Sequence, residues 1–465
     1  MLFSSLVFLC YFLPIVSLLY FIVPHKVHNF VLLLSSLFFY AWGEPEYIFV
    51  MLLITTINFT AGILVDKITN CRKLFLTFAI CANLSILSYF KYANFFIENV
   101  NIIFSTSISN IKVIMPIGIS FFTFQALSYV IDVYRGNVAV QKRLDKMVLY
   151  ISFFPQLIAG PIVRYYDFQG YIEKRSIDTD DVIYGLERFI VGLAKKTLLA
   201  NTMGALADNI YKTGVTGIDI TIAWVGAIAY TLQIFFDFSG YSDMAIGLGR
   251  MFGFHFLENF NYPYISKSIT EFWRRWHISL STWFKEYLYI PLGGNRAGKS
   301  RMYINLCIVF LLTGFWHGAS WNFIIWGFWH GLFIILEKKF DYTDNQKIPN
   351  CILHIYAILV VVIGWIFFRA DNLSIAIKYI SIMFGLSYNE KIPFTLAYYL
   401  TRKEIIVGAI AIICSVPWVE KTCKISTLHN NWIILTRRIS MLLLLIASMV
   451  SIAASSYNPF IYFRF

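Results

Sequence analysis

The stretch that decides the fold runs from Met302 to Leu336 and reads MYINLCIVFLLTGFWHGASWNFIIWGFWHGLFIIL. Its two apolar segments, 302–316 and 321–336, suit a lipid bilayer, and a short polar break separates them. The tetrapeptide Phe-Trp-His-Gly nevertheless occurs twice, with its copies 13 residues apart. Because ionisable side chains are costly inside a membrane, each histidine there is a functional candidate. The stretch therefore predicts membrane-embedded helices that carry a polar site.

Comparable apolar segments cover most of the remaining chain. Of its 465 residues, 58% are hydrophobic and only 14% are charged, and the mean hydropathy is +0.66. A soluble chain usually has about 25% charged residues, and apolar runs of roughly 20 residues can cross a bilayer. We therefore predict an all-α, polytopic transmembrane protein with about 11–13 helices in a single domain, 1–465. The expected apolar segments are 2–23, 29–42, 47–65, 74–90, 111–131, 147–162, 182–207, 220–236, 302–316, 321–336, 352–368, 403–418 and 432–455.

Lysines and arginines indicate the orientation of the early helices. Cationic connections near residues 26, 72–73 and 135–146 alternate with acidic or neutral ones, as expected if the N-terminus is outside. Segment 1–23 is predicted to be a retained helix rather than a cleaved signal peptide. Segment 147–162 breaks the alternation, because it is short, contains Pro155, Gly160 and Pro161, and is followed by cations. We predict that it is re-entrant or lies in the membrane plane.

The longest polar interval, 255–301, is basic. It has seven lysines or arginines and three glutamates, a net charge of 7 − 3 = +4, so it is expected to face the cytoplasm. Its aromatic residues recur with near-helical spacing, which suggests an amphipathic helix in the membrane interface. Arg274, Arg275, Arg296 and Lys299 are candidates for binding an anionic, phosphate-bearing donor. The alternative is a positive-inside loop that only contacts anionic lipid.

Three histidines are candidates for catalysis or binding. A buried neutral imidazole can accept a proton, as a general base for a hydroxyl nucleophile must. We favour this role for His317; for His330, packing beside glycines of neighbouring helices is an equal alternative. His277 lies among tryptophans and arginines in the basic interval, where an interfacial packing role is equally compatible with its surroundings.

Two other patterns resemble catalytic motifs but lack the required context. Residues 293–300, GGNRAGKS, fit the P-loop pattern, which works only between a strand and a helix; a glycine turn that contacts phosphate without hydrolysing it remains an alternative. Residues 240–244, GYSDM, lack the closing glycine of a nucleophile elbow, so neither Ser242 nor its neighbours Asp237 and Asp243 are assigned a catalytic role. The seven cysteines contain no CxxC pair and are predicted to be small buried apolar residues. No metal site is expected.

Several ordered motifs resemble the membrane-bound O-acyltransferase family, and within it the bacterial branch of alginate O-acetylases and related polysaccharide or peptidoglycan acetylation proteins. The resemblance extends over nearly the whole chain. It rests on YAWG (40–43), PQLIAGPIVR (155–164), DFSGYSDMA (237–245), NYPY (261–264), FWRRWHISLS (272–281), YIPLGGNR (289–296), the Trp-His-Gly stretch and the ending NPFIYFRF (458–465).

The resemblance implies helices around a central tunnel in the cell inner membrane. It also implies transfer of an acyl group, most simply acetyl, from a cytoplasmic thioester such as acetyl-CoA toward an extracytoplasmic glycan. His317 matches the family's essential histidine, and His277 lies in a context similar to that of a second functional histidine. Trp316, Trp321, Asn322 and His330 are expected to line the tunnel. A separate extracytoplasmic acetyltransferase is the expected partner, with the lipid bilayer; no permanently bound cofactor and no nucleic acid are expected.

Two other functions are compatible with the sequence. A transporter or flippase for a cell-envelope glycan precursor could also use a cationic funnel, but the sequence lacks obvious pairs of intramembrane acids and bases. A non-catalytic scaffold is the third hypothesis. The acceptor stays open among alginate, peptidoglycan, another exopolysaccharide and a small carrier molecule.

Overall fold

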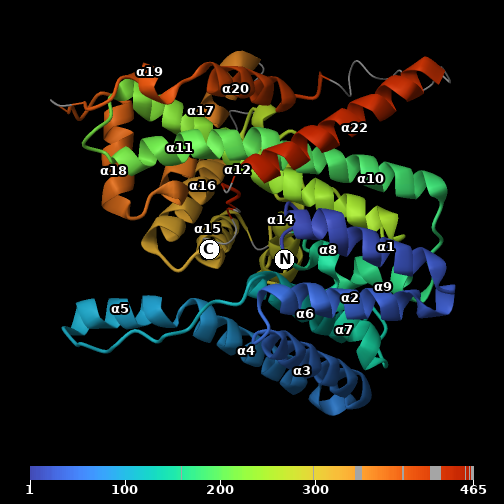
Figure 1. The fold of residues 1–465 in the computed structure, drawn as a ribbon. Helices are drawn as coiled ribbons and strands as arrows, with labels where there is room; N and C mark the ends of the chain where they lie inside the picture. The colour runs from blue at the N-terminus through green and yellow to red at the C-terminus, as the bar shows by residue number, and fades with distance from the viewer. Residues whose placement is uncertain are drawn as a thin grey trace. The chain divides into compact units, whose positions relative to one another are not determined.

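Every regular element in the described part of the computed structural model is a helix, which confirms the all-α prediction (Figure 1). The structure describes residues 1–158, 160–296, 298–340, 348–389, 392–418, 431–455, 457–459 and 461. Ala159, Ala297, Cys423 and part of the C-terminal motif lie outside the described residues. The chain divides into two compact units. That residues 1–465 form a single functional domain stays a prediction.

The first unit comprises residues 1–189 and 242–257. Its core is the packing of α3 on α4 and α6, where Asn58 and Asn83 exchange amide hydrogen bonds of 2.9 and 3.0 Å. Such pairing satisfies polar groups between apolar helices. The elements are η1 (Phe8–Phe12), α1 (Leu13–Ile22), η2 (His25–Val27), α2 (His28–Gly43), α3 (Ile48–Lys67), η3 (Thr69–Cys71), α4 (Arg72–Lys91), α5 (Ala93–Phe104), α6 (Ile119–Arg135), α7 (Leu144–Ser152), α8 (Phe154–Leu157), α9 (Tyr165–Glu173) and most of α10 (Thr179–Ala194).

The second unit comprises residues 190–241 and 258–465 and contains all three candidate histidines. Helix α12 (Ile220–Met251) begins in this unit and ends in the first. The other elements are η4 (Lys195–Ala200), α11 (Asn201–Thr213), η5 (Pro263–Ile265), α13 (Ile269–Arg275), α14 (Ile278–Phe284), η6 (Lys285–Tyr289), α15 (Lys299–His317), α16 (Trp321–Phe340), α17 (Asn350–Arg369), α18 (Leu373–Met383), α19 (Leu396–Tyr399), α20 (Arg402–Cys414) and α22 (Asn431–Ala454).

Among the described residues, five helical segments are long and apolar enough to cross a membrane: 48–67, 69–91, 220–251, 350–369 and 432–454. The chain is therefore a multi-pass membrane protein. The α15–α16 hairpin is not among the five, since polar residues and the charged residues at the start of α15 and the end of α16 lower its hydropathy. Expected segment 111–131 becomes helical only at Ile119, because Pro116 and Gly118, with a φ of 77°, precede the helix.

Segment 147–162 does not form one crossing helix. It contains only the end of α7 and the four-residue α8, with Phe153 breaking the helix between them. Since an α-helix rises about 1.5 Å per residue, neither helix can span a bilayer core of about 30 Å. The prediction that this segment is no ordinary span is consistent with this geometry.

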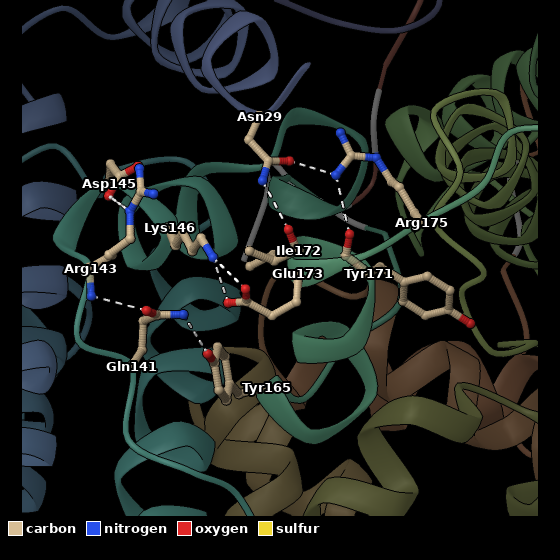
Figure 2. Close-up of polar contacts among 10 residues, drawn as sticks. All are labelled: Asn29, Gln141, Arg143, Asp145, Lys146, Tyr165, Tyr171, Ile172, Glu173 and Arg175. Carbon is tan, nitrogen blue, oxygen red and sulfur yellow. Dashed lines mark hydrogen bonds and ion pairs between the residues drawn. The ribbon is translucent and has the colours of Figure 1, made fainter. Parts of the chain in front are cut away.

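Cations on either side of segment 147–162 have local partners, and Figure 2 shows those of Lys146 and Arg175. Lys146 pairs with Glu173 at 2.6 Å, and Arg164 pairs with Asp167 at 2.7 Å. Arg175 donates to Asn29 Oδ1 at 2.5 Å and its guanidinium lies 4.7 Å from the centre of the Phe254 ring. These contacts stay within the first unit, where Lys146 and Arg164 each have a carboxylate partner and Arg175 has an amide and an aromatic ring.

The prediction that the cysteines are buried is wrong. Five of the six described cysteines are exposed and Cys307 is partly exposed, and all six are free thiols. They lie in or beside apolar helices, which in a membrane protein can turn apolar residues outward toward lipid.

Candidate active site

Glycines bring the backbones of α15 and α16 into direct contact. A Cβ atom on Gly314 would lie 2.2 Å from the Phe323 carbonyl oxygen, and one on Gly327 would lie 2.2 Å from the Phe310 carbonyl oxygen. No side chain fits at either position. The two Phe-Trp-His-Gly copies are thus on opposite arms of a closely packed hairpin, which fixes the positions of His317 and His330.

His317 is the last residue of α15 and is 4% exposed. Its Nδ1 atom lies 2.8 Å from the carbonyl oxygen of Thr313. A carbonyl oxygen only accepts hydrogen bonds, so Nδ1 carries the proton and Nε2 carries the lone pair in the neutral ring. The end of a helix also favours a positive charge. His317 is therefore arranged to accept a proton on Nε2 and to tolerate the resulting charge.

Aromatic rings surround His317. Trp316 and Trp326 lie with ring centres 4.8 Å from its ring, and Phe368 of α17 lies at 5.5 Å. These rings keep water away from the imidazole, and water exclusion strengthens electrostatic interactions in a site.

His277 is fully buried between α13 and α14. Its Nδ1 lies 3.2 Å from Asn259 Oδ1, which also accepts from the Ser279 amide at 3.1 Å. Since an amide N–H only donates, the Asn259 atom is an oxygen, so His277 also carries its proton on Nδ1. Burial, with His317 nearby, lowers the pKa of His277 well below its usual value, so His277 is neutral at physiological pH.

The backbone of His277 is in the left-handed region, with a φ of 44°. Such a conformation costs a residue other than glycine about 1–2 kcal/mol and ends α13 before α14 begins. The adjoining chain holds it in place: the Ile278 amide donates to the Asn259 carbonyl at 2.9 Å, and the Asn261 amide donates to the Arg275 carbonyl at 2.9 Å. Trp316 lies 6.3 Å from the His277 ring, next to His317.

His330 lies inside α16 and is completely buried among aromatic rings. The Trp326 and Trp273 ring centres are 5.2 and 5.4 Å away, and Phe272 stacks on it at 6.1 Å. Among the described residues neither ring nitrogen has a hydrogen-bond partner. A Cβ atom on Gly364 would lie 2.7 Å from Nε2, so a glycine of α17 makes room for this histidine. Both readings of His330, packing and function, remain compatible with this environment.

The other residues expected to line a tunnel, Trp316, Asn322 and Trp321, differ in burial and in their contacts. Trp316 contacts both His277 and His317. Asn322 is buried and donates to the Ala370 carbonyl at 2.6 Å, which ties α16 to the end of α17. Trp321 is 55% exposed. Of these three, Trp316 is the one that the described contacts place beside the histidines.

The prediction of one amphipathic interfacial helix in the basic interval is wrong. The interval contains a 3-10 helix, two short α-helices and a π-helix before α15 begins, and six aromatic residues between 272 and 287 are buried inside the protein. Near-helical spacing cannot reveal the left-handed residue that divides the segment. These aromatic residues are Phe272, Trp273, Trp276, Trp283, Phe284 and Tyr287.

The four candidate donor-binding cations fall into two groups. Arg274, Arg296 and Lys299 are exposed, and none of them has an ion-pair partner in the part of the chain that the structure describes. Arg275 instead donates from Nε to Glu271 at 2.9 Å and from Nη1 to the Asn261 carbonyl at 3.1 Å. Arg275 therefore links α13 to the segment around Asn261. Arg274, Arg296 and Lys299 are available to bind an anion.

Neither the P-loop pattern at 293–300 nor the GYSDM sequence at 240–244 has the structural context that its catalytic function requires. The described residues contain no strand, and residues 293–296 form turns ahead of α15. Asn305 of α15 donates to the carbonyls of Leu292 and Gly294, each at 3.2 Å. Ser242 lies buried in the middle of α12, not on a strand-to-helix turn.

Buried ion pairs between helices were not anticipated from the sequence. Lys196 Nζ lies 2.6 Å from Asp237 Oδ1, and both side chains are only 2% exposed. Arg188 pairs with Asp243 at 2.7 Å, and Arg369 with Asp208 at 2.7 Å. The sequence shows no obvious pairs of this kind, because pairing between distant helices leaves no local spacing to detect. Asn259 was missed for the same reason.

Comparison with known proteins adds a family and relatives to this geometry. A sequence profile of the membrane-bound O-acyltransferase family matches residues 143–368. A protein of Pseudomonas putida named "Probable alginate O-acetylase AlgI" is 40% identical, with 100% of both chains covered. A protein of the same name from Azotobacter vinelandii is also 40% identical over the whole of both chains. A peptidoglycan O-acetyltransferase of Helicobacter pylori is 34% identical, covering 83% of this chain and 80% of the relative.

Proposed function

Because the chain belongs to the membrane-bound O-acyltransferase family, we propose that it transfers acetyl from a cytoplasmic thioester, such as acetyl-CoA, toward an extracytoplasmic polysaccharide. O-acyl transfer itself is the activity of the family. The acetyl donor, the direction across the membrane, the inner-membrane location, the central tunnel and a separate extracytoplasmic acetyltransferase partner are parts of the proposal. The acceptors named for the relatives, alginate and peptidoglycan, support a glycan.

The buried, tautomer-fixed ring of His317 is the observation that carries the proposed chemistry. Its Nε2 atom takes the proton of an acceptor hydroxyl while the hydroxyl oxygen attacks the thioester carbonyl. The new ester C–O bond forms and the C–S bond breaks. The proton on Nε2 then passes to the departing thiolate, so the enzyme returns to its starting state. A positioned base of this kind contributes about 10²- to 10⁴-fold in rate.

The remaining site residues bind and orient. Arg274, Arg296 and Lys299 are exposed cations that suit the phosphates of a thioester donor. His277 is neutral and carries a lone pair on Nε2, so it can accept a hydrogen bond from the acceptor or donor. Trp316 lies near both histidine rings and is proposed to contact the acyl group.

Complementation tests the role of His317 without knowledge of the acceptor. A deletion strain would receive the wild type, His317→Ala or the exposed-site control His25→Ala, with base-labile acetate measured in envelope fractions. We expect His317→Ala to accumulate in the membrane with a normal melting temperature but to lose acetate by at least about 100-fold. His25→Ala should match the wild type. Normal acetylation by His317→Ala would falsify the assignment.

A glycan transporter or flippase is the rival function, and the buried ion pairs favour it to some extent, since such pairs occur in transport pathways. The two functions can be distinguished with the protein in detergent solution. A transferase with donor and acceptor present releases free thiol without a sealed membrane, whereas a transporter releases none.

A further inference from the structure

A buried carboxylate near the end of α16, that of Glu337, has no part in the proposed chemistry. Its side chain is 3% exposed, and among the described residues it has no ion-pair partner. Burying a carboxylate is costly unless hydrogen bonds offset the loss of water around it. The groups that donate to Glu337 therefore indicate what the carboxylate does.

Both oxygens of Glu337 accept hydrogen bonds from the first residues of α13. Oε1 accepts from the Ile269 amide, and Oε2 accepts from the Thr270 amide at 2.9 Å and from the Thr270 hydroxyl at 2.6 Å. The Tyr356 hydroxyl of α17 donates to Oε1 at 3.2 Å. Four donors thus surround the buried charge, and three of them belong to α13.

These bonds complete the N-terminus of α13. The first amides of a helix have no acceptor within the helix, and they favour a negative charge beside them. Ser268 Oγ accepts from the Glu271 amide at 2.9 Å, and the Phe272 amide donates to the Ser268 carbonyl at 2.9 Å. Glu337 accepts from the two amides that remain. Because α13 has only seven residues, and so short a helix is marginal in isolation, its position depends on these contacts.

The same face of α16 also contacts the last turn of α13. Trp326, His330 and Glu337 follow one another at intervals of four and seven residues, so their side chains lie on one side of the helix. The Trp273 ring centre lies 5.7 Å from Trp326 and 5.4 Å from His330. Phe272 stacks on His330 with ring centres 6.1 Å apart and planes at 9°. Helix α13 therefore runs along α16, held by the carboxylate at its first turn and by aromatic rings at its last.

Two residues of the proposed chemistry depend on where α13 lies. Arg274 is on α13 itself, one helical turn after Thr270, and its side chain is exposed. His277 is the second residue after the helix ends. The Trp326 ring on the same face of α16 lies 4.8 Å from the His317 ring. Helix α16 thus fixes a candidate donor cation and the turn at His277 relative to the proposed base.

We propose that Glu337 is a positioning residue of the acyl transfer, which acts through α13 by holding Arg274 where the phosphates of the donor bind. This rests on the proposed function and adds a determinant of donor affinity that lies outside the donor surface. Glu337 is buried and does not touch the donor. Its loss displaces α13, so that removal of the Arg274 side chain then has little further effect.

A double-variant comparison on the full-length protein in nanodiscs tests this role. Glu337→Gln keeps the size of the side chain but replaces one acceptor oxygen with an amide group. Acetyl-CoA affinity is measured by calorimetry for the wild type, Glu337→Gln, Arg274→Ala and the double variant. We expect Glu337→Gln to bind at least about 10-fold more weakly, as for a lost hydrogen bond to a charged group. Because the two residues act through one helix, the double variant should bind within about 2-fold of the weaker single variant.

Glu404→Gln is the matched control, because Glu404 also caps a helix of the second unit. It accepts from the Thr401 amide at 3.1 Å at the start of α20, which carries no residue of the proposed chemistry. Glu404→Gln should lower the melting temperature without changing acetyl-CoA affinity, which separates positioning of the donor site from a general loss of stability.

Thr270→Val provides the test if Glu337→Gln fails to fold. It removes the hydroxyl that donates to Glu337 and leaves both α13 amides bonded to the carboxylate. We expect acetyl-CoA binding about 2- to 10-fold weaker than in the wild type, as for one lost hydrogen bond. Unchanged affinity in a folded Thr270→Val would count against the proposal.

Three results would overturn the proposal: wild-type affinity in Glu337→Gln, losses of affinity that multiply in the double variant, or an equal loss in Glu404→Gln. Failure of the proposed function looks different, because the wild type itself would then neither bind acetyl-CoA nor release thiol from it with an acceptor present. That result would overturn both.

Discussion

At the scale of single residues, the candidate site depends on which nitrogen of each histidine carries the proton. The Thr313 carbonyl fixes His317, and the side chain of Asn259 fixes His277. In both rings the lone pair is therefore on Nε2. Asn259 is a positioning residue, because it acts through His277 and through the Ser279 amide that it also binds.

Replacement of Asn259 should reduce activity through the orientation of His277. Asn259→Ala leaves the buried Nδ1–H of His277 without an acceptor, at a cost of about 1–3 kcal/mol. If this whole cost raises the free energy of the transition state, the rate falls roughly 5- to 150-fold. Asn259→Asp keeps an acceptor oxygen and should recover part of the rate. Thiol release as a function of pH and acceptor concentration measures this. A folded Asn259→Ala enzyme with the wild-type rate and pH profile would contradict the role.

At the scale of elements, the C-terminal segment completes a buried ion pair between η4 and α12. Lys196 contacts Asp237 and also donates to the Pro459 carbonyl, and the Ile461 amide donates to Asp237 at 2.9 Å. Buried charges need such additional hydrogen bonds to offset desolvation. Residues of the C-terminal motif thus have a structural role, which the sequence alone does not reveal.

Removing one member of this pair should destabilise the protein more than removing both. Lys196→Met leaves an uncompensated buried carboxylate, which costs about 3–5 kcal/mol. The double variant Lys196→Met/Asp237→Leu leaves no isolated charge and should recover much of that loss. Thermal unfolding in detergent compares the two, with exposed Lys142→Met as the control. If the single and double variants have the same melting temperature, an uncompensated buried charge does not explain the loss of stability.

At the scale of the whole molecule, the proposed reaction needs a donor-binding surface as well as a catalytic base. The exposed cations Arg274, Arg296 and Lys299 are proposed for the donor, and His317 is proposed as the base. Both features lie in the second unit. A scaffold without enzymatic activity would need neither feature.

Charge reversal at Arg274 tests the donor surface. Arg274→Glu should weaken acetyl-CoA binding by about 1.5–3 kcal/mol, the range for hydrogen bonds to charged groups, or roughly 10- to 150-fold. Lys142→Glu reverses an equally exposed cation of the first unit and should have no effect. Calorimetry with purified protein measures both. Equal affinities would exclude Arg274 from the donor site, and altered assembly with unchanged affinity would favour the scaffold.

Much of the architecture could be predicted from local pattern. The helical class and the multi-pass membrane character follow from apolar runs, and these two predictions are confirmed. The prediction that segment 147–162 is no ordinary span is consistent with its two short helices, because proline acts locally on the backbone. The helix in the basic interval was predicted wrongly, since one left-handed residue, His277, divides it without changing the spacing of the aromatic residues.

The sequence by itself determined the helices, the membrane character and the pair of Phe-Trp-His-Gly tetrapeptides, because hydropathy and motif identity are properties of neighbouring residues. Only the tertiary structure decided that Asn259 orients His277, that Lys196 pairs with Asp237, and that Arg369 lies over the Tyr211 ring. These contacts join residues that are 18 or more positions apart. They arise from close packing between helices, and no local periodicity records which helix faces another.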